Sequence, residues 1–174
     1  PSAPATVRLK VAASNHAPLA GDDAVVTGED TPITFQVLAN DSDADHDPLS
    51  VVSLTPPQHG VAIRNADGSI TYTPDANYHG ADRFDYTLGD GHGGEDVGTI
   101  TLTVTPVNDA PTLAVIADRA LSEGEELSFA LAAADIDGDA LSYTVSVGDA
   151  LVEPTGHFRF TARDGDASHS FTVQ

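Results

Sequence analysis

Apolar residues in this chain alternate with polar ones in many short runs. Between residues 99 and 105, Ile100, Leu102 and Val104 are separated by threonines. This spacing of two is typical of a β-strand that buries one face. Similar runs, bounded by Gly, Pro, Asn and Asp, predict strands at residues 33–38, 49–54, 60–64, 69–73, 83–88 and 97–105, then at 112–116, 126–133, 141–147, 157–162 and 169–173. This pattern predicts an all-β fold of antiparallel β-sandwiches.

Two segments need separate comment. Residues 120–135 contain good helix formers, but Leu127, Phe129 and Leu131 alternate, so a strand is predicted there too. Residues 60–74 predict a hairpin whose turn is Asn-Ala-Asp-Gly at 65–68.

Some of the sequence occurs twice. NHAP at 15–18 corresponds to NDAP at 108–111, and DADHDPLS at 43–50 corresponds to DIDGDALS at 135–142. Such self-similarity indicates tandem modules. We therefore predict three segments: residues 1–13 as the last strand of a preceding repeat plus a linker, residues 14–107 as a complete sandwich, and residues 108–174 as a second, shortened sandwich.

The second module is predicted to lack a hairpin. YTLGDGHGG at 86–94 corresponds to FTARDGDAS at 160–168, which reduces the offset between the modules from 92 to 74 residues. The difference of 18 residues leaves no counterpart for the hairpin at 60–74.

The chain is strongly acidic, with 21 Asp and 6 Glu against 7 Lys and Arg and a formal net charge of −20. Asp favours turns and loops over helices, so the acids are expected in loops. Few basic residues argue against nucleic-acid binding, which needs Lys and Arg for phosphate contacts. The absence of Cys removes disulfides and thiolate chemistry. No apolar run approaches the roughly 20 residues that span a bilayer, so no direct membrane insertion is expected.

Three aspartates occupy alternate positions in each copy of the repeated acidic stretch: Asp43, Asp45 and Asp47, then Asp135, Asp137 and Asp139. Carboxylates this close repel one another unless a cation neutralises them. Hard oxygen ligands in such number suit Ca²⁺, which takes six to eight oxygens. An EF-hand is excluded, because position twelve of that loop needs a glutamate. Counting from Asp41 or Asp135 places Val52 or Ser146 there.

These motifs, together with YTPDANYHGADRFDY at 72–86 and the closing DG and TITLTV segments, resemble the bacterial cadherin-like and VCBS-type tandem repeats of RTX (type I-secreted) adhesins. The resemblance implies tandem Ig-like or cadherin-like sandwiches with Ca²⁺ at their junctions. It implies an extracellular or cell-surface location. The implied partners are neighbouring repeats of the same chain and a host or bacterial surface glycan or protein.

Sandwich topology and the cadherin pattern together assign two sets of ligands. At the junction between the two modules, the expected ligands are Glu29, Asp82, Asn108, Asp109, Asp135, Asp137, Asp139 and Asp164. At the N-terminal junction, the expected ligands are Asn15, Asp43, Asp45, Asp47 and Asp90. Asp22, Asp23 and Asp41 are interpreted as solvated loop charges instead.

Two functions remain open from the sequence. The first is a calcium-stiffened extension module of a secreted or surface adhesin. The second is a carbohydrate-binding module of an extracellular polysaccharide-degrading protein, which the absence of Trp and the presence of only four Tyr weaken. No enzyme is expected, since the catalytic motifs GxSxG and HExxH do not occur.

Overall fold

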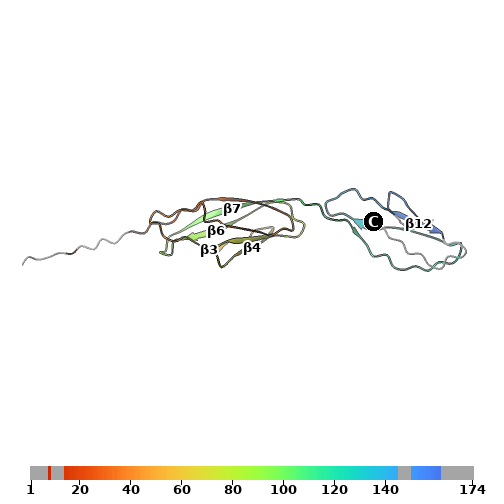
Figure 1. The fold of residues 1–174 in the computed structure, drawn as a ribbon, viewed down its shortest axis with the longest axis horizontal. Helices are drawn as coiled ribbons and strands as arrows, with labels where there is room; N and C mark the ends of the chain where they lie inside the picture. The colour runs from red at the N-terminus through yellow and green to blue at the C-terminus, as the bar shows by residue number, and fades with distance from the viewer. Residues whose placement is uncertain (1–7, 9–13, 145–149, 162–174) are drawn as a thin grey trace, which may run out of the picture. The chain divides into compact units, whose positions relative to one another are not determined.

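The computed structural model describes residue 8, residues 14–144 and residues 150–161 (Figure 1). It divides into two compact units, Pro1–Val107 (unit 1) and Asn108–Gln174 (unit 2). All regular structure in the described residues is β-strand, which confirms the predicted fold class. Residue 8, which forms no strand, is the one described position of the segment 1–13 in which a last strand was predicted, and the strand predicted at 169–173 lies outside the described residues.

The described residues of unit 1 form seven strands in two sheets. In chain order they are β1 (Asp23–Gly28), β2 (Ile33–Phe35), β3 (Ser50–Leu54), β4 (Gly60–Arg64), β5 (Ile70–Pro74), β6 (Gly80–Gly89) and β7 (Glu95–Thr105). One sheet has the order β1-β7-β6-β3 and the other the order β2-β5-β4. Neighbouring strands are antiparallel except β1 and β7, which are parallel over six residue pairs from Asp23–Ile100 to Gly28–Thr105. Strand β1 was not predicted.

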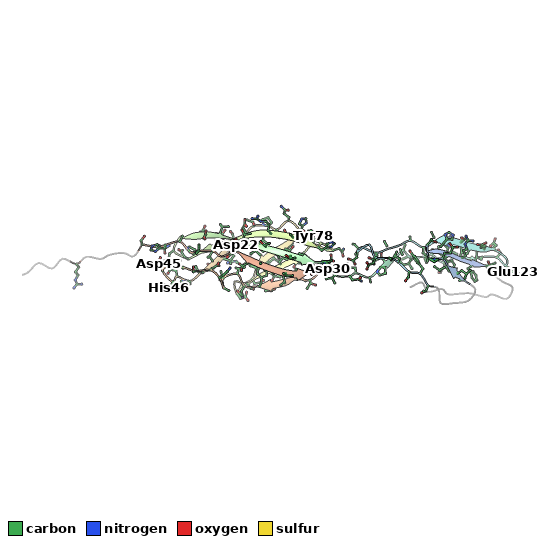
Figure 2. All side chains as sticks on the ribbon, turned by 90° about the horizontal axis from the view of Figure 1, so that it is seen from above. Asp22, Asp30, Asp45, His46, Tyr78 and Glu123 are labelled. Atoms are coloured by element: carbon green, nitrogen blue, oxygen red, sulfur yellow. The ribbon has the colours of Figure 1, made fainter. Side chains whose placement is uncertain are left out.

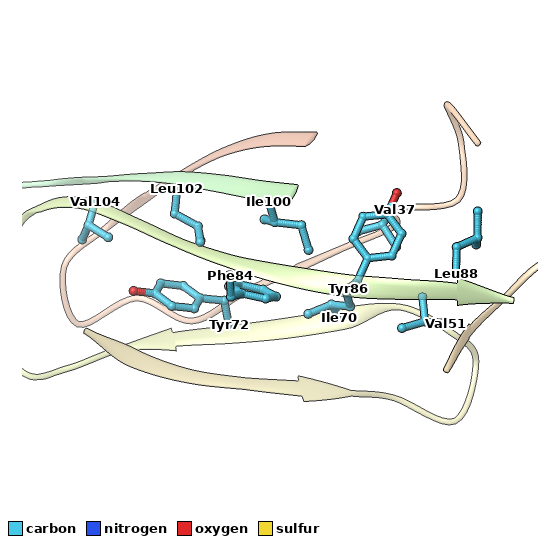
Figure 3. Packing of buried hydrophobic residues seen from close by; sticks show 10 residues of the cluster. All are labelled: Val37, Val51, Ile70, Tyr72, Phe84, Tyr86, Leu88, Ile100, Leu102 and Val104. Atoms are coloured by element: carbon cyan, nitrogen blue, oxygen red, sulfur yellow. The ribbon is translucent and has the colours of Figure 1, made fainter. Parts of the chain in front are cut away.

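The core of unit 1 lies between these sheets, as Figure 3 shows. Alternate residues of β6 and β7 supply much of it, because every second side chain in a strand points to the same face. Phe84, Tyr86 and Leu88 come from β6, and Ile100 and Leu102 from β7, all at most 2% exposed. The alternation noticed in the sequence is therefore the alternation of buried and exposed faces.

The described residues of unit 2 form five strands: β8 (Thr112–Leu113), β9 (Glu126–Ala130), β10 (Ala133–Ala134), β11 (Leu151–Val152) and β12 (His157–Thr161). They form the sheets β10-β8 and β11-β12-β9. The predicted strand at 120–135 is present as β9, whereas the prediction at 141–147 is wrong for residues 141–144, which form no strand. Residues 145–147 lie outside the described residues.

The prediction that unit 2 lacks a hairpin is wrong. Strand β12 pairs with β11 on one side and with β9 on the other, as β5 pairs with β4 and β2 in unit 1. The two hairpin turns also match: Gly68 and Gly156 have φ values of +86° and +78° and each closes its turn. NADGSITYT at 65–73 therefore corresponds to EPTGHFRFT at 153–161. The alignment of residues 86–94 with 160–168 rested on similar residue types, and it is inconsistent with the strand pairing that matches 65–73 with 153–161.

Candidate functional site

The acidic loop of unit 1 lies at its proximal end, the end at which the chain enters the sandwich. One oxygen of Asp43, Oδ1, accepts hydrogen bonds from the backbone N–H groups of Asp45 (2.8 Å) and Asp47 (3.1 Å). His46 has φ = +62°, which turns the loop between them. Carboxylate oxygens of the three aspartates lie within 4.8 Å of one another. Asp45 and His46 are labelled at this end in Figure 2.

Asn15 and Asp90 are also at this end, brought there by the chain before β1 and by the β6–β7 loop. Asn15 Nδ2 donates to Asp90 Oδ2 at 2.7 Å. Asp90 is 1% exposed, and its Oδ1 accepts from the backbone N–H groups of His92 (2.7 Å) and Gly94 (3.0 Å). The bond from Asn15, followed by these backbone bonds, holds the pKa of Asp90 below its usual range. Asp90 is thus a charged anchor of the β6–β7 loop.

Two histidines contact the acidic triplet. The backbone N–H of His16 donates to Asp45 Oδ2 at 2.7 Å, and its ring Nδ1 lies 3.1 Å from the same oxygen. His92 Nδ1 lies 3.1 Å from Asp47 Oδ2. The backbone bond from His16 is the main reason that the pKa of Asp45 lies below its usual value. Asp43 Oδ2 is buried and has no hydrogen-bond partner among the described residues.

Unit 2 repeats this loop. Asp135 Oδ1 accepts from the N–H groups of Asp137 (3.0 Å) and Asp139 (3.1 Å). The N–H of Asp109 donates to Asp137 Oδ2 at 2.7 Å, as that of His16 does to Asp45. Gly138 turns this loop with φ = +79°. A hollow in unit 2 is lined in part by Asn108, Asp109, Asp135 and Asp139. The predicted acids of this loop are therefore gathered at the proximal end of unit 2.

Glu29 marks the distal end of unit 1, where the chain leaves the sandwich. It follows β1 and is only 2% exposed. Its Oε1 accepts a hydrogen bond from the backbone N–H of Val107 at 2.7 Å. Its Oε2 lies 3.6 Å from Nδ1 of the exposed His79. Burying a carboxylate costs free energy unless it is paired. The contacts with Val107 and His79 therefore offset the cost of burying Glu29.

Asp82, also predicted as a ligand, has a structural role in unit 1. It is 5% exposed. Its oxygens accept four hydrogen bonds of 2.8–3.1 Å, from Tyr72 Oη and from the N–H groups of Gln58, His59 and Arg83. Burial alone would raise the pKa of Asp82, but these bonds outweigh it and lower the pKa. Both oxygens are thus engaged within unit 1, which does not favour metal ligation by this side chain.

Asp164 lies outside the described residues. It was predicted as the counterpart of Asp90, on the alignment that the β11–β12 hairpin overturns. Its role as a ligand stays a prediction without that support.

Asp23 and Asp41 form a half-buried acidic pair, which differs from their interpretation as solvated loop charges. Each has an Oδ2 atom that is buried and has no hydrogen-bond partner among the described residues. Asp41 Oδ1 accepts from Gly21 N–H and Tyr86 Oη, both at 2.8 Å. Burial first, then the charges of Asp41 and Asp22, raise the pKa of Asp23 to about 6. The position of Asp23 opposite the buried Ile100 in the β1–β7 register explains its inward direction.

Aromatic side chains are largely used for packing. Every Phe and Tyr of the described residues is at least partly buried. Tyr78 stacks on His59 with ring centroids 4.0 Å apart, and its hydroxyl donates to Ala81 O at 2.7 Å. The described surface thus has no fully exposed aromatic platform of the kind that sugar binding commonly uses.

Comparison with known proteins identifies the family. Residues 15–103 and 108–174 each match the family model described as bacterial Ig domain, so this chain belongs to that family. Such domains are usually extracellular or at the cell surface. Among the described residues, none forms a helix that could cross a membrane. The assignment to RTX adhesins stays a prediction.

The chain is also similar to segments of longer proteins. It is 35% identical over 102 residues to Protein GAMETE EXPRESSED 2 of Arabidopsis thaliana, covering 58% of this chain and 11% of that protein. It is 39% identical over 77 residues to Integrin beta-like protein A of Dictyostelium discoideum, covering 43% and 4%. The chain thus spans only a small fraction of these relatives.

The solved structures that match this chain include an extracellular cadherin segment and a hydrolase. Extracellular cadherin domains 3–6 of protocadherin gamma B2 match with a TM-score of 0.40 and 18% identity, over 87% of this chain and 45% of that one. An endo-fucoidan hydrolase of glycoside hydrolase family 107 matches with a TM-score of 0.44 and 18% identity, over 90% and 28%.

Proposed function

We propose that this chain is a calcium-binding structural extension module of a large secreted or cell-surface bacterial adhesin, in which Ca²⁺ stiffens the junctions between repeats. The observation that carries the proposal is the acidic loop that both units form with the same hydrogen bonds. In each copy, the first aspartate uses one oxygen to fix the loop, through Asp43 Oδ1 and Asp135 Oδ1. Carboxylate oxygens of the other two aspartates are thereby brought to the same end of the unit.

The chemistry of these loops favours Ca²⁺. In unit 1, three carboxylates have oxygens within 4.8 Å of one another. Their repulsion is relieved when a divalent cation binds. Ca²⁺ accepts many oxygen ligands in flexible geometry, and extracellular modules bind it with Kd of roughly 10⁻⁴–10⁻³ M.

The linker between the units supports the idea of a metal-stiffened junction. In unit 1, Glu29 accepts a hydrogen bond from the backbone N–H of Val107. In unit 2, Asp137 accepts one from the backbone N–H of Asp109. Residues 107 and 109 can be at most about 7 Å apart, because consecutive Cα atoms are separated by about 3.8 Å. An ion that Glu29, Asn108, Asp109 and Asp137 bound together would therefore hold this linker. The proposed partners of the chain are the neighbouring repeats on either side.

Calcium binding is tested by titrating the chain with Ca²⁺ and with Mg²⁺ after chelator treatment, following both binding heat and melting temperature. We expect Ca²⁺ to raise the melting temperature by several degrees. A ligand that binds only the folded state adds about 2.7 kcal/mol at 100 times its Kd. Asp45→Asn and Asp137→Asn keep an acceptor for the linker N–H but remove a charge, so each should weaken binding at its own loop.

Asp67→Asn is the matched control, since Asp67 lies in the β4–β5 turn, where it binds Ser69. This variant should bind Ca²⁺ as the parent does. Absence of binding heat and of any thermal shift at about 10 mM Ca²⁺, well above the expected Kd range, would exclude the proposal. Small-angle scattering with and without Ca²⁺ tests the stiffened junction, and a glycan array tests the carbohydrate-binding alternative.

A further inference from the structure

Strand β4 forms an open edge of unit 1. In the sheet β2-β5-β4 it pairs with β5 on one side, and on the other side no strand of the described residues pairs with it (Figure 1). Its side chains Val61 and Ile63 are 56% and 58% exposed. An edge strand of this kind pairs readily with another strand unless charge, proline or a bulge prevents it.

The other three edge strands of unit 1 are protected in ways that β4 is not. Strand β1 lies between Asp22 and Glu29, and β2 has only three residues. Strand β3 contains a register shift, and its Val51 O accepts a hydrogen bond from Arg64 Nη1 at 2.6 Å. Residues 48–66, which include β4, contain no Asp or Glu in a chain of net charge −20. Another acidic chain therefore meets the least repulsion at β4.

The ladder between β4 and β5 shows which backbone groups of β4 face the open edge. The N–H of Asn65, just after β4, donates to Ser69 O at 2.8 Å. Hydrogen-bonded pairs alternate along an antiparallel ladder, so the odd-numbered residues of β4 bond to β5. Pro74, which has no N–H, accordingly lies opposite an even-numbered residue. The even-numbered residues of β4 direct their N–H and C=O groups to the open edge: Gly60, Ala62 and Arg64.

This edge is complementary to itself. Two antiparallel β4 strands centred on Ala62 would set Gly60 opposite Arg64 of the other copy, and these pairs would exchange about six backbone hydrogen bonds. Val61 would then face Ile63 of the other copy in the non-hydrogen-bonded pairs, where side chains lie closer together. We propose that two copies of this chain associate through β4, which joins their sheets in the order β2-β5-β4-β4-β5-β2.

The charges near β4 also favour a second copy as the partner. Arg64 is the only charged residue of β4, and the two-fold symmetry places the two arginines at opposite ends of the interface. The acid nearest to β4 along the chain is Asp67, which the same register sets beside Pro57 of the other copy. No two acids thus face each other across the pair. Neither acidic loop takes part, so this inference does not rest on the proposed function.

Sedimentation velocity of the whole chain over a range of concentrations tests the proposal, both with Ca²⁺ and with a chelator. We expect a dimer that tightens as salt is added, because salt screens the repulsion between two acidic chains. Val61→Lys/Ile63→Lys sets lysines opposite each other across the interface and should weaken dimerisation by roughly tenfold or more. Val61→Glu/Ile63→Lys sets opposite charges there, so it should dimerise more tightly than the double-lysine variant. Val97→Lys is the control, because Val97 is 58% exposed on the inner strand β7, and it should dimerise as the parent does.

Hydrogen exchange of the parent chain tests the register without any substitution. As the concentration rises, the amides of Gly60, Ala62 and Arg64 should exchange more slowly, whereas those of Val61 and Ile63 should not change, because they already bond to β5.

The proposal is overturned if the chain stays monomeric at every concentration, or if Val97→Lys weakens the dimer as much as the double-lysine variant does. It is also overturned if the dimer forms without slowing the exchange of the Ala62 amide. A dimer that requires Ca²⁺ would contradict it as well, since β4 lies outside both acidic loops.

Discussion

Asp23 shows how a single carboxylate can make the stability of unit 1 depend on pH. Its side chain points inward from β1, and its pKa in the folded chain is about 6 against an ordinary value of 3.8. The folded state therefore binds this proton more tightly than the unfolded state does. The stability that protonation contributes is complete below about pH 4 and is lost as the pH rises through 6.

Asp23→Asn should remove this dependence. The amide stays uncharged at every pH and can donate to the neighbouring Asp41 carboxylate. We expect the free energy of unfolding to rise by about 1–2 kcal/mol at pH 8, with little change at pH 4. Urea unfolding at both pH values measures this.

Asp67→Asn is expected to lower the free energy of unfolding at pH 8, the opposite of Asp23→Asn. The reason is that hydrogen bonds from Ser69 stabilise the charged form of Asp67 and lower its pKa. If Asp23→Asn destabilised unit 1 equally at both pH values, the residue would contribute through packing and not through its charge.

The sequence predicted some of the candidate metal ligands better than others, and individual side chains show why. The alternating aspartates could be predicted, because their spacing alone places them in one loop. Asp82 and Glu29 are both acidic and both buried, yet Asp82 accepts four hydrogen bonds and Glu29 accepts one from the end of the unit. Which backbone N–H groups surround an acid depends on strand register, which the letters do not reveal.

At the level of strands, β6 and β7 are held together by a contact between a large and a small residue. Gly98 faces Tyr86 across the pair. A Cβ atom at Gly98 would overlap the Tyr86 ring. The ring cannot easily move away, because its hydroxyl lies 2.8 Å from both Gly21 O and Asp41 Oδ1. The glycine thus makes room for an aromatic residue that ties β6 to the loops before β1 and after β2.

Gly98→Ala is therefore expected to destabilise unit 1 by about 1–3 kcal/mol, the usual cost of overpacking a core. Thermal or urea unfolding measures the change. Thr101→Ala, on the exposed face of the same strand, should stay within about 0.5 kcal/mol of the parent. Equal effects of the two substitutions would show that Tyr86 is free to repack.

Prediction of strands was most successful where alternation and turn chemistry coincided. The β4–β5 hairpin was found because Asn65 to Gly68 supply the turn residues between two apolar runs. Strand β1 was missed because Ala24, Val25 and Val26 do not alternate, although the register directs Val25 inward and leaves Val26 62% exposed. The turn glycine Gly156 could have revealed the second hairpin.

In the chain as a whole, the two units share the same type of fold but differ in the size of their described buried cores. The described core of unit 1 contains ten buried residues, nine from the strands of both sheets and Val37 from the segment after β2. The described core of unit 2 contains Leu131, Ala150, Phe158 and Phe160, with five partly buried apolar residues packed on it. The repeat itself was visible in the sequence. Which strand of unit 2 corresponds to which strand of unit 1 became clear only from the pairing of β9 with β12. Short strands give only a weak hydrophobic pattern in the sequence.

The parallel pairing of β1 and β7 has a mechanical consequence. The chain enters unit 1 just before β1 and leaves it just after β7, so tension along the chain pulls these adjacent strands in opposite directions. Because they are parallel, their ladder over six residue pairs is loaded in shear, and its hydrogen bonds must yield together. The chain contains no Cys, so introduced cysteine pairs provide unique handles for force spectroscopy. Pulling at Ser14 and Val107 should need more force than pulling at Gly60 and Pro74, where the hydrogen bonds between β4 and β5 break in succession. Equal rupture forces would show that the β1–β7 ladder does not carry the load, whereas the expected difference would make unit 1 a link that resists a steady pull.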